Sequence, residues 1–230
     1  MKIKVLVADK LPQKYLDMLT EHGLEVINNP KLGENDLPEA AKDVDVIVVR
    51  STKVNEETIM RAEKLNLIVR AGAGVNNINI SAANKKGVYV ANCPGKNAIA
   101  VAELAMGLII ALDRRIPHNV SDFKNGVWNK GEYSKAEGLF GKTIAVVGLG
   151  NIGKELVKRA HAFGMNVYGK DISRVEGLPY KDFSEFDKIL PLADIVSLHL
   201  PATPQTKGLF NEQMFSYMKD GAILINTSRA

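Results

Sequence analysis

The chain has 230 residues, of which 46% are hydrophobic and 24% are charged, and its formal net charge is +4. This composition is typical of a globular protein, and no apolar stretch approaches the ~20 residues of a membrane-spanning helix. The basic residues are scattered rather than clustered, which argues against a nucleic-acid-binding face. The single cysteine, Cys93, excludes an intramolecular disulfide and favours a cytoplasmic setting.

Residues 1–97 alternate short apolar runs with helical patterns. One such pattern opens at Pro12 and closes at Gly23. Apolar runs such as "VDVIVVR" suit strands that are buried on both faces, as in a parallel sheet. We therefore predict an α/β layer with right-handed crossovers. The expected strands are Val5–Ala8, Glu25–Ile27, Val44–Val49, Leu67–Ala71 and Val88–Ala91.

Two of these strands end in residues that suggest a binding site. Arg50 and Ser51 follow one strand, and a glycine-rich loop at 72–76 follows the next. A guanidinium matches carboxylate and phosphate geometry, and a glycine loop offers backbone N–H donors to an anion. The alternative is that Arg50 pairs with Glu56 or Glu57 and that the glycines only turn the chain.

A long helix is predicted from Asn97 to about Arg114, after the Pro-Gly break in "NCPGKN". It is mostly apolar, so we expect it to be buried almost all round, in a core or at an interface. The polar, weakly periodic arm that follows carries the only tryptophan, Trp128, and an arm of this length usually packs on something.

A second α/β array follows the arm, and its most informative stretch is "VVGLGNIGKE". The expected strands are Ile144–Val147, Val167–Gly169, Ile195–Leu198 and Ala222–Ile225. The first ends at a Gly-x-Gly-x-x-Gly motif, formed by Gly148, Gly150 and Gly153, that opens a helix. These glycines permit a tight turn, backbone approach to a pyrophosphate and close helix packing, and the helix start favours phosphate. The motif therefore predicts dinucleotide binding.

Asp171 ends the second strand of this array, 18 residues after Gly153. A carboxylate there can accept hydrogen bonds from the adenosine ribose and would repel a 2′-phosphate, which favours NAD over NADP. Lys170 and Arg174 weaken that exclusion. The alternative is that the glycines merely turn the chain and that Asp171 caps a loop.

The last two strands also end in polar residues. His199 follows one strand at the carboxyl edge, where ligands bind in such sheets. We interpret it as a structural neighbour of the cofactor, with a catalytic base as the alternative. His22, His118 and His161 are expected at the surface. The final strand leads to Thr227, Ser228 and Arg229, three polar residues that suggest a binding or active site.

Six segments in this order resemble the D-2-hydroxyacid dehydrogenase family: "VRSTKV", "RAGAGVNNIN", "NAIAVAE", "GKTIAVVGLGNIGKE", "SLHLPATPQTKGLFNE" and "GAILINTSRA". The first is most similar to the members that oxidise 3-phosphoglycerate. The resemblance covers the whole chain. It implies two doubly wound α/β domains, with a flavodoxin-like substrate domain at 1–97 and a Rossmann NAD domain at 98–230, and an active site in the cleft.

The resemblance also implies roles for individual residues. The substrate side would comprise Arg50, Ser51, Ala73, Gly74, Val75, Asn76 and Asn97. The NAD side would comprise Gly148, Gly150, Asn151, Ile152, Gly153, Asp171, His199, Leu200, Pro201, Thr206, Thr227 and Ser228. Arg229 would hold the substrate carboxylate as a catalytic residue. No metal is implied.

This sequence departs from the family pattern in several places. Ala73 stands where threonine is frequent, Ala98 or Ala100 where serine is frequent, and Ala230 where glycine is expected. The catalytic histidine and glutamate of the family lie downstream of the matched arginine. We therefore expect the polypeptide to continue past Ala230, and the 230-residue piece alone to be inactive.

The resemblance implies an NAD-dependent enzyme that oxidises 3-phosphoglycerate to 3-phosphohydroxypyruvate, the first step of serine synthesis. It also implies a homodimer at least, and a tetramer as an alternative. Two other functions remain open. One is a glyoxylate or hydroxypyruvate reductase, or another 2-hydroxyacid dehydrogenase. The other is a non-catalytic, NAD-responsive binding protein similar to the corepressors built on this fold.

Overall fold

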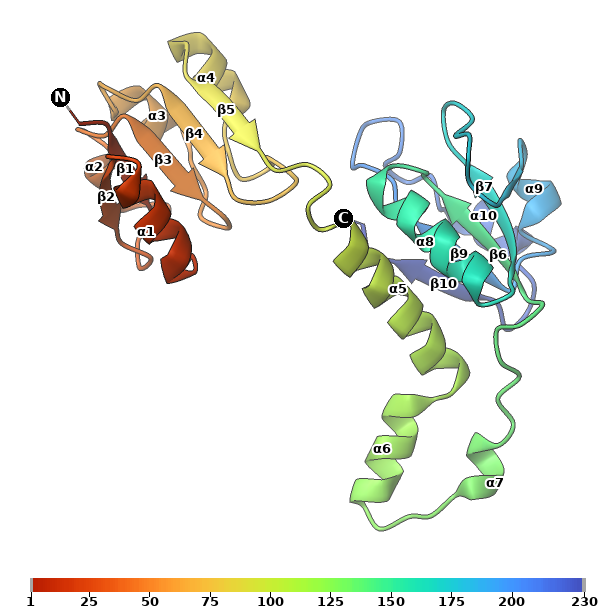
Figure 1. The fold of residues 1–230 in the computed structure, drawn as a ribbon. Coiled ribbons are helices and arrows are strands. Elements are labelled where there is room, and N and C mark those ends of the chain that lie inside the picture. The colour runs from red at the N-terminus through yellow and green to blue at the C-terminus, as the bar shows by residue number, and fades with distance from the viewer. Residues whose placement is uncertain (1, 229–230) are drawn as a thin grey trace. The chain divides into compact units, whose positions relative to one another are not determined.

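The computed structural model describes residues 2–228 and divides into two compact units, Met1–Lys96 and Asn97–Ala230. Each unit is built on its own parallel sheet (Figure 1). The division falls one residue before the expected boundary, so Asn97 belongs to the second unit by its contacts. No helix within residues 2–228 is long and apolar enough to cross a bilayer.

The first unit contains a five-stranded sheet in the order β2-β1-β3-β4-β5. Its strands are β1 (Lys4–Val7), β2 (Glu25–Asn28), β3 (Val46–Val49), β4 (Leu67–Arg70) and β5 (Tyr89–Asn92). This is the doubly wound, flavodoxin-like order, in which the winding reverses between β1 and β3. The five predicted strands are confirmed, with ends that shift by one or two residues.

Helices cover the two faces of this sheet unequally. They are α1 (Gln13–Glu21), α2 (Leu37–Ala40), α3 (Glu56–Arg61) and α4 (Ile80–Lys86). One face packs with residues of α2, α3 and α4 into a large core that includes Ile47, Ile59 and Ile68. The other face packs with Leu16 of α1, and beside this helix an apolar groove of about 600 Å³ stays open.

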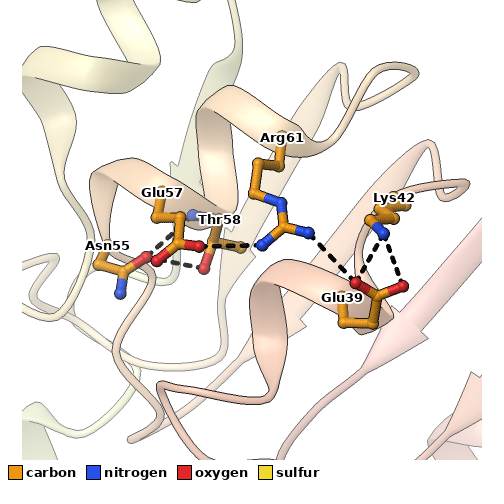
Figure 2. Close-up of polar contacts among 6 residues, drawn as sticks. All are labelled: Glu39, Lys42, Asn55, Glu57, Thr58 and Arg61. Carbon is orange, nitrogen blue, oxygen red and sulfur yellow. Dashed lines mark hydrogen bonds and ion pairs between the residues drawn. The ribbon is translucent and has the colours of Figure 1, made fainter.

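The start of α3 shows how local chemistry fixes a helix in this unit. The Asn55 side-chain oxygen accepts hydrogen bonds from the backbone N–H and the hydroxyl of Thr58, both at 2.9 Å, which satisfies a donor at the helix start. Further along, Arg61 pairs with Glu57 at 2.9 Å and with Glu39 at 3.2 Å (Figure 2). The first of these pairs occupies Glu57, which was one of the two possible partners predicted for Arg50.

The second unit contains a five-stranded sheet in the order β10-β9-β6-β7-β8. Its strands are β6 (Thr143–Val147), β7 (Asn166–Lys170), β8 (Lys181–Asp182), β9 (Ile195–Leu198) and β10 (Ile223–Asn226). This is the Rossmann order, with the winding reversed between β6 and β9. The four predicted strands are confirmed. The edge strand β8 was missed because two charged residues carry no apolar pattern.

Helices lie on both faces of the second sheet. They are α5 (Ala98–Asp113), α8 (Asn151–Ala162), α9 (Phe186–Ile189) and α10 (Glu212–Tyr217). One core joins Ile109 of α5 and Leu156 of α8 to the strands, and the core of the other face includes Ile189 of α9. These packed layers hold the carboxyl ends of β6, β9 and β10 in place.

The expectation that α5 is buried almost all round in a core is wrong, and its burial at an interface stays a prediction. The side facing α8 and β10 is buried, as at Ala102 and Ile109. On the other side, Leu104, Leu108 and Leu112 are 55%, 40% and 52% exposed. The sequence could not separate the two sides, because both are apolar.

The polar arm folds into two short helices, α6 (Ile116–Lys124) and α7 (Lys130–Tyr133), which extend away from the sheet of their unit (Figure 1). Arg115, with a left-handed φ of 51°, makes the turn between α5 and α6. Its guanidinium pairs with Glu132, and the Tyr133 hydroxyl donates to Asp122 at 2.6 Å. These contacts join the two helices of the arm.

Candidate functional site

Each of the three glycines of the phosphate-loop motif has different surroundings. Gly148 has a φ of +93°, and a Cβ there would lie 2.7 Å from the His199 carbonyl oxygen. A Cβ on Gly153 would lie 1.9 Å from the Gly148 carbonyl oxygen. A Cβ on Gly150 would meet no atom within 4 Å, so the space beside it is open. The loop therefore combines two close internal approaches with one free face, as phosphate binding requires.

Asp171 holds this loop directly. One oxygen of its carboxylate accepts the N–H of Leu149 at 2.5 Å, and the other accepts the N–H of Ile172 at 2.7 Å. The side chain is exposed, and each carboxylate oxygen has a second lone pair free for a further donor. Asp171 therefore stabilises the glycine loop by a hydrogen bond and is also an acceptor suited to ribose hydroxyls.

The ends of β9 and β10 carry two buried polar atoms without a partner among the described residues: Nδ1 of His199 and the hydroxyl oxygen of Thr227. These strands are neighbours, with Asn226 in register with Leu198. Buried polar atoms nearly always have a hydrogen-bond partner. Two such atoms without a partner at one sheet edge therefore indicate that a polar ligand binds there. This observation fits a nucleotide cofactor and the predicted roles of both residues.

His199 is held at the strand edge as a buried, neutral ring, and its role beside the cofactor stays a prediction. Burial lowers the pKa of His199 to about 4, so the ring is neutral near pH 7. Its Nε2 lies 2.9 Å from the Ser197 hydroxyl, and its backbone N–H donates to Val147 at 2.8 Å. The other three histidines, His22, His118 and His161, are exposed as expected.

Four of the predicted cofactor residues come together in one cavity of about 650 Å³: Leu200, Pro201, Thr206 and Ser228. Thr206 is anchored by hydrogen bonds within its own loop, because its hydroxyl bonds the Pro201 carbonyl and accepts from the Thr203 N–H. Asn151 and Ile152 form the first turn of α8, beside the glycine loop. Arg229 lies outside the described residues, so its predicted role stays a prediction.

In the first unit, Arg50 and Ser51 follow β3 beside the point where the winding reverses. Both are exposed, and among residues 2–228 the Arg50 guanidinium has no ion pair. Glu57 pairs with Arg61, and Glu56 lies 3.9 Å from Lys85. The structure therefore gives no support to the structural alternative for Arg50.

The glycine loop of the first unit is held by a neighbouring strand end. Asn92 donates its side-chain amide to the Ala73 carbonyl at 2.6 Å, and the Cys93 N–H donates to the Gly72 carbonyl at 3.0 Å. Ala73, Gly74 and Val75 are partly exposed, and Asn76 is exposed. Asn97 is exposed and precedes α5 without capping it through its side chain.

Sequence reasoning missed the residues that support these loops. The main examples are Asp9 after β1, Arg70 at the end of β4 and Asn92 at the end of β5. A signal was available for Asp9, because it directly follows an apolar strand at the edge where Arg50 also lies. Within residues 2–228 no group of three His, Cys, Asp or Glu side chains could hold a metal ion.

Known proteins of one family match this chain over nearly all of its residues. Residues 106–230 match a family model described as D-isomer specific 2-hydroxyacid dehydrogenase, NAD binding domain. The chain is 42% identical to a D-3-phosphoglycerate dehydrogenase of Methanocaldococcus jannaschii, over 99% of the chain and 44% of that relative. It is 38% identical to a hydroxypyruvate reductase of Thermotoga maritima, over 99% of the chain and 74% of that relative.

Solved structures agree with these sequence matches. An NAD⁺-bound 3-phosphoglycerate dehydrogenase of Entamoeba histolytica superposes with a TM-score of 0.81 at 30% identity, over 100% of this chain and 72% of that one. The chain spans less than half the length of the first two curated relatives, at 44% each. The chain belongs to the D-isomer specific 2-hydroxyacid dehydrogenase family, and residues 106–230 belong to its NAD-binding domain.

Proposed function

We propose that the polypeptide containing this chain oxidises D-3-phosphoglycerate to 3-phosphohydroxypyruvate with NAD, as the first step of serine synthesis. The observation that carries the proposal is Arg50, an exposed guanidinium without an ion pair among the described residues, at the carboxyl edge of a doubly wound sheet. Ligands bind at this edge in such sheets, and a guanidinium matches phosphate bidentately. Relatives named D-3-phosphoglycerate dehydrogenase support the same substrate.

The cofactor is held by the second unit in this proposal. Backbone N–H groups of the loop at Gly148–Gly153 bind the pyrophosphate, and Asp171 accepts the ribose hydroxyls. When bound, NAD would supply the hydride acceptor for oxidation at C2 of the hydroxy acid, and the hydroxyl proton would pass to a general base. The residues of this chain bind and orient the two reactants, and the neutral His199 and Thr227 offer their unpaired polar atoms to the cofactor.

Cations beside Asp171 do little to favour a 2′-phosphate in this proposal. Lys170 donates to the Ser184 carbonyl and lies over the rings of Phe183 and Phe186, at 5.7 and 5.6 Å from their centroids. Arg174 pairs with Asp182 at 3.3 Å. Because both cations have partners, the uncompensated carboxylate of Asp171 supports selection of NAD.

The first unit holds the substrate in this proposal. Arg50 binds the phosphate group, and the Ser51 hydroxyl and the loop at Ala73–Asn76 add further hydrogen-bond donors. Arg229 holds the carboxylate of the hydroxy acid. A second candidate function is reduction of hydroxypyruvate, which the relative from Thermotoga maritima supports. That substrate has no phosphate, so Arg50 separates the two candidates.

The test measures steady-state turnover of the full polypeptide with 3-phosphoglycerate and with glycerate. Arg50→Ala is expected to weaken use of 3-phosphoglycerate by about 2–3 kcal/mol, as for a lost charge-assisted pair, and to leave glycerate nearly unchanged. Arg61→Ala is the matched control, because it removes an arginine of the same unit that is engaged with Glu57 and Glu39. Equal losses for both substrates would contradict phosphate recognition by Arg50. NAD binding without any turnover would favour a non-catalytic, NAD-responsive protein.

We also propose that the protein forms a homodimer through the second unit. The exposed leucines of α5 continue into an arm whose Phe123 and Trp128 are 68% and 80% exposed. Apolar area of this kind usually marks an interaction surface, and a two-fold interface pairs the same patch on both subunits.

A further inference from the structure

Asp9 gathers three consecutive backbone donors onto one carboxylate oxygen. Its Oδ2 accepts the N–H groups of Arg50 at 2.7 Å, Ser51 at 3.0 Å and Thr52 at 3.0 Å. The Thr52 hydroxyl adds a longer bond to the Ala8 carbonyl at 3.4 Å. The whole turn after β3 is thus wrapped around the residue that follows β1.

This arrangement occupies the donors that such a turn would otherwise offer to an anion. Successive N–H groups pointing at one centre form an anion-binding concavity. Here the anion is a side chain of the same unit, so the amides of residues 50–52 are not available to a substrate. The Arg50 guanidinium and the Ser51 hydroxyl are the donors that the turn keeps for a ligand.

The carbonyl side of the same turn is fastened as well. Arg70 donates its Nε to the Arg50 carbonyl at 3.0 Å, and Asn77 donates its side-chain amide to the Thr52 carbonyl at 2.8 Å. Gly72 makes room for this contact, since a Cβ there would lie 1.9 Å from a terminal nitrogen of Arg70. Residues from the ends of β1 and β4 therefore hold the backbone of Arg50 from both sides.

We propose that Asp9 is a positioning residue that orients Arg50 and Ser51 for the substrate, an inference that rests on the proposed phosphate-binding role of Arg50. The carboxylate does not pair with the guanidinium. It fixes the backbone from which that guanidinium extends. This backbone lies at the carboxyl ends of β1 and β3, between which the winding reverses and where ligands bind in doubly wound sheets.

A matched control exists at the other end of the same sheet. Asp45 accepts the Lys4 N–H at 2.8 Å, so it also joins β1 to β3 through a carboxylate and a backbone amide. It lies at the amino ends of the strands, away from Arg50. Asp9→Asn and Asp45→Asn each remove one half-buried charge from a strand junction, and only the first touches the turn.

The experiment compares the full wild-type polypeptide with Asp9→Asn, Asp9→Ala, Asp45→Asn and Arg50→Ala. For each, KM and kcat are measured with 3-phosphoglycerate and with glycerate, and NAD affinity is measured separately. Asp9→Asn is expected to raise the KM for 3-phosphoglycerate about tenfold, because the asparagine side chain keeps one acceptor oxygen but loses the charge. Asp9→Ala is expected to raise this KM further, because alanine has no acceptor. Glycerate KM, NAD affinity and all values for Asp45→Asn should stay near wild type. Should Asp9→Ala fail to fold, Asp9→Asn still decides.

Two outcomes separate this inference from the function on which it rests. If Arg50→Ala raises the 3-phosphoglycerate KM and Asp9→Asn does not, Asp9 is not a positioning residue and the phosphate-binding role stands. If Arg50→Ala leaves that KM unchanged, phosphate recognition fails and the positioning role fails with it. Equal changes for both substrates in Asp9→Asn, matched by Asp45→Asn, would reduce Asp9 to a stabilising residue.

Discussion

At the scale of the residue, Asp171 shows how one carboxylate can serve both the fold and the ligand. It fastens the N–H of Leu149, which lies between two glycines of the phosphate loop, and keeps lone pairs for a ribose. Spacing in the sequence was sufficient to find Asp171, because the distance from a glycine motif to the end of the next strand is set by one helix. Its bond to the loop needed the structure.

We predict that Asp171→Ala narrows the difference between NAD and NADP affinity, because it weakens NAD binding and favours NADP binding. The variant loses acceptors for the ribose hydroxyls, which weakens NAD by about 1.5–3 kcal/mol, and it removes the charge that repels a 2′-phosphate. Titration of each cofactor checks this. Asp182→Ala is a useful comparison, because it releases Arg174 without touching the glycine loop. Tighter binding of NADP than of NAD by the wild type would contradict the assignment.

Asp9 and Arg70 mark the limit of what this sequence alone could predict at residue scale. Asp9 meets Arg50 across 41 residues, and Arg70 meets it across 20. No local period connects such positions. Only the strand order brings the ends of β1, β3 and β4 to one edge, and that order follows from packing of the whole sheet.

At the scale of the element, the unit formed by β6, the glycine loop and α8 was predictable because its local rules agree. An apolar strand, a glycine motif and the helix that the motif opens all indicated the same structure. The two helices of the arm, in contrast, were not predictable from the sequence. Helices α6 and α7 depend on contacts such as Arg115 with Glu132, so their sequence alone indicated only weak periodicity.

We predict that two alanine substitutions in the glycine loop separate folding from binding. Gly153→Ala places a Cβ 1.9 Å from the Gly148 carbonyl, so it should destabilise the second unit by about 1–3 kcal/mol and abolish NAD binding. Gly150→Ala meets no atom within 4 Å and has an ordinary φ of −66°, so the melting temperature should hold. NAD binding should still be lost, because the backbone can no longer approach the pyrophosphate. Calorimetry and cofactor titration of both variants check this, and equal melting temperatures would refute the distinction.

At the scale of the whole molecule, both units depend on carboxylates that stay ionised at strand junctions. Burial raises the pKa of Asp194, but Lys219 and the Thr143 N–H outweigh it, so the pKa lies below its usual value of 3.8. Asp9 behaves in the same way, because its three amide donors outweigh burial. A group whose pKa is lower when folded stabilises the fold above its unfolded pKa, and this contribution is lost as the pH falls through the folded pKa.

We therefore predict that the free energy of unfolding is steady near neutral pH and falls as the pH drops below about 4, in line with the model-compound value of 3.8. Asp194→Asn should lower stability at pH 7 by about 1 kcal/mol and make the acid loss shallower. Asp17→Asn, at an exposed residue of α1, should change neither quantity. Denaturant titrations from pH 3 to pH 7 check the prediction, and an unchanged acid slope in Asp194→Asn would count against it.

The exposed apolar side of α5 predicts that the protein assembles into a dimer. Leu104, Leu108 and Leu112 recur every four residues, so they form one stripe along the helix. Because each leucine is about half exposed, burying the remainder against a second copy is worth about 1 kcal/mol per leucine, and the largely exposed Trp128 and Phe123 would add to this in a two-fold pairing. Light scattering of the full polypeptide should give a dimer or a larger assembly, and Leu108→Glu should shift it toward the monomer. Met60→Glu, at a somewhat more exposed apolar residue of the first unit, should leave the mass unchanged. A monomeric wild type at micromolar concentration would exclude this surface as a stable interface.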